Sequence, residues 1–415
     1  MLLFPFLSSG QKLINSPVAR YNLGIIEPAG SFRSLGMAGT GTAIRNNTSI
    51  YFVNPASYSS LDTNSFVFDF GMDYGINIIS DGSTNSVSED LNFNHLIIGF
   101  PIMKRWGFAA GVIPVTNGYY NISESVREGD PGYDEITGEY ISYHSGSGGL
   151  TNFFVGTGLN ITRNLSVGAN MSLLFGSIRR YNEFDFADYY YTFQTNMTEM
   201  IKLSGIGMDF GLQYSADLKN DHFFNLGVSL STGKNCKSSF EKISYRYNLY
   251  SSPDTIEYSF NDSTKSYIPG TVRAGLAFGK KHKYTIAIDY VNSLWEKADF
   301  QGSARFVANT STVLLGAEYT PDWLANYSFL KRIDYRLGGH AGNNYLLFNG
   351  SRINEYGVSL GVGIPMRRTY SKTNFYFDYT RKNVTGQTFT HIENYFTFGL
   401  SINLYDMWFL KRKYD

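Results

Sequence analysis

From about residue 64 onward, apolar side chains alternate with small or polar ones, and this period of two residues limits the folds open to the chain. The C-terminal stretch shows the pattern clearly, with Phe396, Phe398, Leu400, Ile402 and Leu404 interleaved with Tyr395, Thr397, Gly399, Ser401 and Asn403. Successive side chains of a β-strand point to opposite faces, so such a stretch forms a strand with one apolar face. The sequence therefore predicts an all-β protein.

Stretches with this alternation recur along the rest of the chain. They lie near residues 64–77, 90–101, 105–118, 148–161, 164–180, 199–216, 222–233, 267–279, 282–293, 309–320, 331–342, 352–364, 373–381 and 392–405. An even number of strands suits a bacterial single-chain barrel, because both ends of the sheet then return to the same side. We therefore expect a transmembrane antiparallel β-barrel of about 14 strands.

Composition favours a membrane barrel over a soluble multidomain protein. Charged residues make up 17% of the chain, below the soluble average of roughly 25%, whereas Tyr and Phe each number 32 and Gly 42. No apolar run approaches the roughly 20 residues of a transmembrane helix, so crossing a membrane requires a closed barrel. The net charge of +0 gives no reason to expect nucleic acid as a partner. We expect a monomeric barrel surrounded by lipid in the outer membrane of a Gram-negative bacterium.

The connections between the predicted strands fall into two sets of unequal length. Tight polar turns such as Lys104-Arg105 and Thr162-Arg163 predict the periplasmic side, and the longer segments 119–147, 181–198 and 234–266 predict extracellular loops. The connection at 321–330 is long for a periplasmic turn, and Trp323, Leu324 and Phe329 indicate a short helix there.

The N-terminal part of the chain lacks the strand pattern. Residues 1–11 resemble the end of a secretory signal peptide, with small residues at a plausible cleavage site. Residues 12–63 are too few to bury a core of their own, so we expect them inside the barrel as a plug. The barrel is then expected over 64–405, followed by a periplasmic tail at 406–415.

The expected plug carries a distinctive motif. A Gly-rich run leads to an Asn-Pro-Ala turn just before the first strand, with Gly36, Met37, Gly39, Gly41, Asn54, Pro55 and Ala56 as its main residues. This run resembles the plug signature of the FadL/TodX/OMPP1 family of outer-membrane transporters of hydrophobic compounds. The resemblance implies a fourteen-stranded barrel and passive uptake of hydrophobic or amphipathic small molecules such as long-chain fatty acids.

The resemblance also implies a ligand groove in the third and fourth extracellular loops. The aromatic and aliphatic residues there are Phe184, Phe186, Tyr189, Tyr190, Tyr191, Phe193, Phe240, Ile243, Tyr245, Tyr247 and Leu249. Exposed clusters of this kind mark binding surfaces. An aromatic girdle at the level of the lipid headgroups is the alternative interpretation.

The family further implies a lateral exit beside a kinked third strand. Pro114 lies in that strand and lacks the amide donor that its ladder position requires, so we expect a break there, either as a lateral portal or as the end of the strand. Several charges, Arg273, Arg336, Glu318 and Asp334 among them, fall on the inward face. They either bind the plug and line a wet lumen, or Arg273 or Arg336 holds a ligand carboxylate.

No motif for catalysis stands out. Gly357-Val358-Ser359-Leu360-Gly361 matches the nucleophile-elbow pattern but falls within a predicted strand, and the six histidines lack metal-ligand spacing. We expect neither enzyme activity, metal nor cofactor. Two other functions stay open beside uptake: a scaffold or partner barrel that binds other envelope proteins in secretion or envelope assembly, and a general diffusion pore.

Overall fold

The computed structural model describes most of the chain. The described residues are 16–80, 85–130, 132–187, 193–248, 250–300, 306–325, 327–348, 350–367, 369–385 and 390–408. The expected signal remnant at 1–11 lies outside them, as do Tyr189, Tyr190, Tyr191, Leu249 and most of the expected C-terminal tail.

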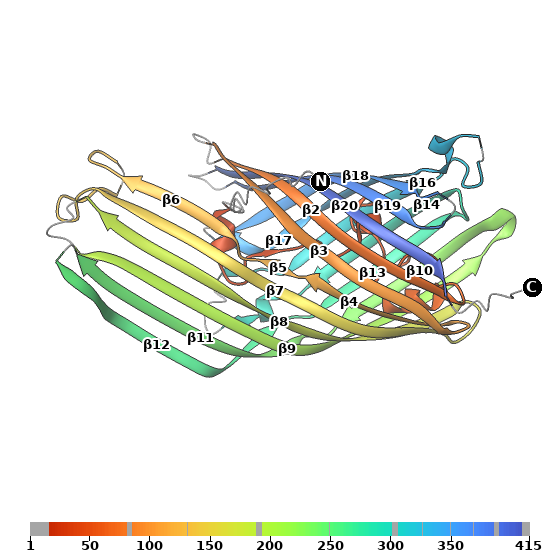
Figure 1. The fold of residues 1–415 in the computed structure, drawn as a ribbon, viewed down its shortest axis with the longest axis horizontal. Helices are drawn as coiled ribbons and strands as arrows, with labels where there is room; N and C mark the ends of the chain where they lie inside the picture. Colours follow the sequence, from red (N-terminus) through yellow and green to blue (C-terminus); the bar gives the residue numbers. More distant parts are fainter. Residues whose placement is uncertain are drawn as a thin grey trace, which may run out of the picture.

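A closed antiparallel barrel of 14 strands makes up most of the molecule, as the alternation predicts (Figure 1). Its elements are β2 (Ser65–Ser80), β3 (Asn85–Met103), β4 (Trp106–Pro114), β6 (Tyr120–Val126), β7 (Tyr140–Asn160), β8 (Leu165–Phe186), β9 (Gln194–Asp217), β10 (His222–Ser231), β11 (Lys234–Asn248), β12 (Ser251–Ile268), β13 (Thr271–Lys280), β14 (Tyr284–Ser293), β15 (Asp299–Phe300), β16 (Thr310–Tyr319), β17 (Asp334–Phe348), β18 (Ser351–Pro365), β19 (Lys372–Thr385) and β20 (Thr390–Met407). Pairing of β2 with β20 closes the barrel. Four barrel strands are interrupted, and their halves are β4 and β6, β10 and β11, β12 and β13, and β14 and β15.

The inward and outward faces follow the predicted phase. On β20, Leu400 and Leu404 are exposed at the outer wall, whereas Ser401 and Asn403 between them are buried in the lumen. Two inward glycines leave room for the N-terminal segment: a Cβ at Gly168 would lie 2.3 Å from the Pro55 carbonyl carbon, and one at Gly227 would lie 2.1 Å from the Thr42 oxygen.

Residues 16–64, which we call the plug, run inside this wall (Figure 1). Their regular elements are short: the 3-10 helix η1 (Pro17–Arg20), β1 (Ile25–Ile26), α1 (Phe32–Leu35) and the 3-10 helix η2 (Pro55–Ser60). β1 pairs with β5 (Thr116–Asn117), which lies between β4 and β6 in the chain.

The expected extracellular loops are largely strands, which corrects the sequence interpretation. β6, β7, β8, β9, β11 and β12 extend beyond the barrel as one open sheet (Figure 1), and the pairing of β8 with β9 continues to Phe184 and Thr195. Alternation persists through these segments, so the hairpins stay paired after they leave the closed part of the barrel. The long connections between the predicted strands are therefore mostly extensions of the same strands into long hairpins.

The connection between β16 and β17 contains the 3-10 helix η6 (Phe329–Arg332), so the helical turn expected near 321–330 lies at the end of that range. A second short 3-10 helix, η4 (Trp295–Lys297), follows β14. Within the described part of the chain, no helix is both long and apolar enough to cross a membrane.

Candidate functional site: the lumen and a gap in its wall

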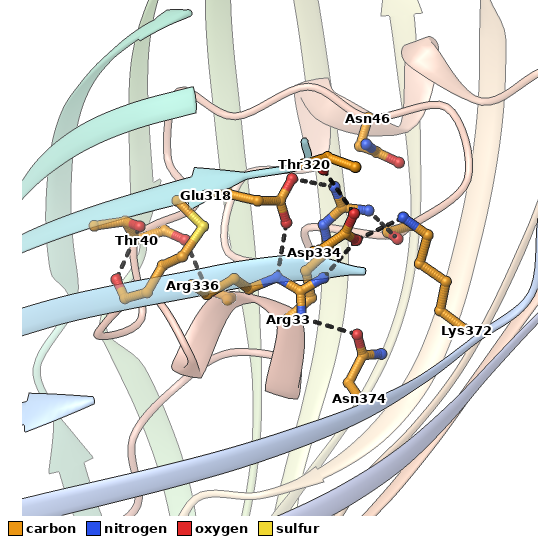
Figure 2. A network of polar contacts seen from close by, with 12 residues as sticks. Arg33, Thr40, Asn46, Glu318, Thr320, Asp334, Arg336, Lys372 and Asn374 are labelled. Atoms are coloured by element: carbon orange, nitrogen blue, oxygen red, sulfur yellow. Dashed lines mark hydrogen bonds and ion pairs between the residues drawn. The ribbon is translucent and has the colours of Figure 1, made fainter. Parts of the chain in front are cut away.

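An ion-pair network fixes the plug to one side of the barrel (Figure 2). Arg33 of α1 lies 2.6 Å from Glu318 of β16, and Arg336 of β17 lies 2.7 Å from the other oxygen of the same carboxylate. Arg336 also pairs with Asp334 at 2.9 Å, and Lys372 reaches Asp334 at 2.5 Å. Burial works to lower the pKa of Arg33, but the Glu318 carboxylate outweighs it and raises that pKa above its ordinary value.

The inward charges are expected either to bind the plug or to hold a ligand carboxylate, and the contacts in this network favour binding of the plug for three of them. Each nitrogen of the Arg336 guanidinium donates one hydrogen bond, to Glu318, Asp334 and Asn374 in turn, and the bond to the Asn374 side-chain oxygen is 2.9 Å long. The Arg336 side chain is 0% exposed, so it presents no open face to a ligand carboxylate. Arg336, Glu318 and Asp334 therefore hold the plug in place.

The backbone of the Gly-rich motif binds separately to side chains of the barrel wall. The backbone amides of Gly41 and Thr42 both donate to one oxygen of Asp289, each at 2.9 Å, and the Ala38 amide donates to Ser359 at 2.8 Å. Gly39 has φ +83°, where side chains are rarely accommodated. At Gly36, a Cβ would lie 3.0 Å from the Cα of Gly361. The motif thus serves close backbone packing against β14 and β18.

The Asn-Pro-Ala turn begins η2. Asn54 accepts from the Ala56 amide at 3.1 Å and donates to the Thr42 carbonyl at 2.7 Å, which ties the turn to the Gly-rich run. No sequence motif points to Arg45, yet this half-buried guanidinium donates to Ser166 at 2.6 Å and Gln213 at 3.0 Å. Its hydrogen-bond acceptors among the described residues are all neutral, and burial lowers its pKa to about 10.

A cavity of about 500 Å³ occupies the lumen beside the plug. Its lining combines apolar residues such as Phe52, Ile113 and Trp295 with charged ones. Arg273 and Lys234 face it, and neither side chain has a hydrogen bond or an ion pair within the described residues. Arg273 therefore differs from Arg336 in having no hydrogen-bonded carboxylate among the described residues, while Asp289 and Asp209 lie close enough to act on its charge.

The barrel wall opens beside β4. β4 ends at Pro114, and the chain turns inward so that β5 pairs with β1 of the plug. β7 keeps β4 and then β6 as neighbours, but the pairing of β3 with β4 stops at Leu96 and Val112. Between β3 and β6, no strand pairing is present among the described residues. We call this interruption of the strand pairing between β3 and β6 the gap.

A second cavity, of about 290 Å³, fills this gap. The residues that line both this cavity and the lumen cavity are Glu27, Pro28, Asp73, Asp90, Asn92, Asn94, Pro114 and Thr116. The two cavities are therefore adjacent. Asn94 donates to Asp73 at 3.0 Å and Asn77 donates to Asp90 at 3.2 Å, so the passage is polar.

The Glu27 carboxyl lies in the plug where the two cavities meet. Its burial, followed by the nearby Asp73 and Asp90 carboxylates, raises the pKa of Glu27 to about 8. This carboxyl therefore holds its proton at neutral pH, which limits the negative charge facing the gap.

The described members of the expected ligand groove lie on both faces of the open sheet, which corrects the expectation of a single groove for these residues. Phe184 and Phe186 pack around Tyr140 on one face of the open sheet, with ring centroids 6.3 and 5.8 Å from it, and Phe240 lies on the same face. Ile243, Tyr245 and Tyr247 fall on the other face, because they are an odd number of residues from Phe240. Phe193 lies under Arg246, 5.2 Å from ring centroid to guanidinium.

Among the described residues, no group of three or more His, Cys, Asp or Glu side chains is arranged to hold a metal ion. The one cysteine, Cys236, is a buried free thiol in the lumen.

Solved structures with the same fold are channels. The CymD monoaromatic hydrocarbon channel is 15% identical, with 92% of this chain and 99% of that chain covered and a TM-score of 0.59. A Pseudomonas aeruginosa FadL homologue is 12% identical, with 92% and 99% covered and a TM-score of 0.62. The Pseudomonas putida toluene transporter TodX is 13% identical, with the same coverage and a TM-score of 0.61. At these identities the likeness establishes the fold.

Comparison with curated proteins gives no significant match. A family model described as BamG matches residues 1–415, the whole of the sequence. The chain therefore belongs to the BamG family, and its barrel has the fold of the FadL and TodX channels.

Proposed function

We propose that this protein is an outer-membrane barrel through which small hydrophobic or amphipathic molecules pass from the lumen sideways into the membrane. The membrane location is supported by the outer wall, where large apolar side chains such as Leu212, Leu315 and Leu400 are about half exposed in the absence of lipid. Such a band around an antiparallel barrel suits hydrocarbon.

The observation that supports the sideways route is that the lumen cavity adjoins the cavity in the gap between β3 and β6. Glu27, Asp73 and Asn92 line both cavities, and a route through them would cross no strand pairing. Leu91 and Phe93 line the outer part of this path. A closed ladder of hydrogen bonds would block such an exit elsewhere in the wall.

The charges along the path favour a ligand without a formal negative charge. A carboxylate would be attracted to Arg273 in the lumen and then opposed by Asp73 and Asp90 at the gap. Long-chain fatty acid anions therefore fit the lumen better than the exit. Uncharged amphipaths and aromatic compounds fit both.

The experiment is a tracer-entry assay on a variant in which a larger side chain narrows the gap. Leu91→Trp places a larger ring at its outer end, and Leu173→Trp adds the same ring at an exposed outer-wall position of β8 as the matched control. In cells whose outer membrane excludes N-phenyl-1-naphthylamine unless the barrel is present, we expect entry to fall about fivefold for Leu91→Trp and to stay unchanged for Leu173→Trp. Equal entry in both variants would reject the lateral route.

A second function, a partner barrel in envelope assembly or secretion, is favoured by the open extracellular sheet. β12 pairs with β11 on one side, and on the other only Ser266 and Tyr267 are paired, to β15, within the described residues. Tyr258 and Phe260 on this edge strand are 62% and 54% exposed. Unpaired edges bind further strands. Stoichiometric co-purification with a defined envelope complex, lost in Tyr258→Lys but not in Leu91→Trp, would favour this function.

A further inference from the structure

The outer wall carries a row of cations where the open sheet leaves the barrel. Arg179 on β8, Lys202 on β9, Lys237 on β11 and Lys265 on β12 are all exposed. Each follows or precedes a buried lumen-facing residue: Ile178, Leu203, Cys236 and Ser266, respectively. Since neighbouring residues of a strand face opposite sides, all four cations point outward.

The register brings these cations together across four adjacent strands. Lys237 lies directly opposite Lys265 in the β11–β12 pair. Lys202 lies opposite Ser177 on β8 and Ser239 on β11, which places it between Arg179 and Lys237. We call Arg179, Lys202, Lys237 and Lys265 the basic row.

The basic row forms no ion pairs among the described residues. Glu241 lies on the same outer face, opposite Met200, but within the described chain none of the four side chains of the row lies within ion-pair distance of a carboxylate. Arg179 donates a hydrogen bond to the Met200 sulfur, at 3.8 Å. Like charges directly opposite each other, such as Lys237 and Lys265, destabilise a sheet. An anion bound between them would remove this repulsion.

The position of the row indicates where that anion comes from. On β8 and β9, one outward serine (Ser177 and Ser204) separates the row from outward apolar residues toward the short turns, namely Phe175 and Ile206, with exposed fractions of 42% and 57%. The row therefore lies at the edge of the apolar band, on the side of the long hairpins. In bacterial barrels the long connections are extracellular, so this edge meets the headgroups of the outer leaflet.

We propose that the basic row binds the phosphate groups of a phosphorylated glycolipid in the outer leaflet. Arg and Lys are the side chains that recognise phosphate, by bidentate hydrogen bonds and as point charges. Four cations from four strands match a headgroup that carries more than one phosphate. This inference rests on the outer-membrane location proposed above and is independent of transport.

The test compares two variants of the full-length barrel reconstituted in nanodiscs. One replaces the basic row by glutamine (Arg179→Gln, Lys202→Gln, Lys237→Gln, Lys265→Gln), and the control removes four cations from the short-turn side (Lys219→Gln, Lys280→Gln, Lys331→Gln, Arg332→Gln). The probes are bisphosphorylated lipid A, dephosphorylated lipid A and phosphatidylglycerol. Native mass spectrometry measures lipid retention.

We expect wild type and the control to retain at least about tenfold more bisphosphorylated lipid A than the basic-row variant does. We expect wild type to retain dephosphorylated lipid A no better than the basic-row variant retains bisphosphorylated lipid A. Lys→Arg replacements at Lys237 and Lys265 should keep retention and exclude a folding defect. The proposal is overturned if the basic-row variant retains bisphosphorylated lipid A as well as wild type does. It is also overturned if wild type retains phosphatidylglycerol as well as it retains bisphosphorylated lipid A. Tracer entry, measured on the same variants in the separate entry assay described above, distinguishes this result from failure of the transport proposal.

Discussion

Arg33 Nη2 of the plug lies 2.6 Å from Glu318 Oε1 of β16, and the two side chains are only 8% and 12% exposed. Glu318 also holds Arg336, so one carboxylate joins the plug to the wall of the barrel. Removing one partner of a buried ion pair leaves an uncompensated charge and costs about 3–5 kcal/mol. The plug is therefore held by charge as well as by packing.

Glu318→Gln should loosen the plug, because Arg33, Arg336 and Lys372 would then share Asp334 alone. We expect faster tryptic cleavage within the plug and a free energy of unfolding lower by about 3 kcal/mol. Glu257→Gln, which breaks the exposed pair with Lys242, is the control and should change the free energy of unfolding by under about 1 kcal/mol. Equal protease resistance in all three proteins would refute this role of Glu318.

Gly168→Ala should displace η2 of the plug, since its Cβ would lie 2.3 Å from a backbone atom of Pro55. We expect a loss of about 1–3 kcal/mol in urea unfolding, as for other overpacked sites. Gly339→Ala is the matched control on β17, because the nearest atom to its Cβ would be 3.7 Å away. A Gly168→Ala protein as stable as Gly339→Ala would contradict the close packing of the plug.

The stability of the protein should depend on pH through Glu27. The folded state raises the pKa of this carboxyl to about 8, chiefly by burial and then through Asp73 and Asp90, with Lys382 opposing them. The unfolded state loses this proton first, so the contribution is complete below the ordinary pKa of 4.5 and is lost as the pH rises toward 8.

Glu27→Gln should therefore be more stable than wild type at pH 8, with a difference that shrinks toward pH 5. The exposed Glu128→Gln should show no such trend. Thermal unfolding of the three proteins at four pH values measures it. A constant difference between Glu27→Gln and wild type across this range would rule out titration of Glu27.

Arg273 should bind anionic amphipaths in the lumen, because it is unpaired there. Arg273→Met should weaken retention of a long-chain fatty acid by about tenfold, the value of one charge-assisted hydrogen-bonded contact, and leave entry of N-phenyl-1-naphthylamine unchanged. Arg336→Met should instead lower stability, because it breaks the plug network. Fatty acid retention that is equal in Arg273→Met and wild type would remove Arg273 from the ligand path.

The local alternation of apolar and polar residues predicts the barrel strands but not the places where they are interrupted. The alternation on β20 predicted which side chains face outward, since strand periodicity is a property of neighbouring residues. Pro114 predicted a break for a local reason, the missing amide donor. The inward turn after it depends on pairing of Thr116 and Asn117 with Ile25 and Ile26, some 90 residues earlier in the chain, and no local signal encodes that register.

The site was predictable to a similar extent. The period-two alternation predicts that Arg273 and Arg336 face inward. It does not predict that Glu318, Asp334 and Asn374 accept hydrogen bonds from Arg336 and not from Arg273. The aromatic residues at 184–247 were assigned to loops because the connections are long. The alternation of apolar and polar side chains continues through these residues and indicates strands instead. It places Phe240 and Tyr245 on opposite faces of the sheet.

Photo-crosslinking tests the lateral route most directly. An uncharged tracer that carries a diazirine group is added to the barrel in proteoliposomes, illuminated, and mapped by peptide mass spectrometry. The route through the gap predicts labels on β3 at Leu91 to Asn94 and on Thr116 to Tyr119, which line the gap cavity. Labels confined to the extracellular hairpins and the short-turn end of the lumen, with none at the gap, would contradict it.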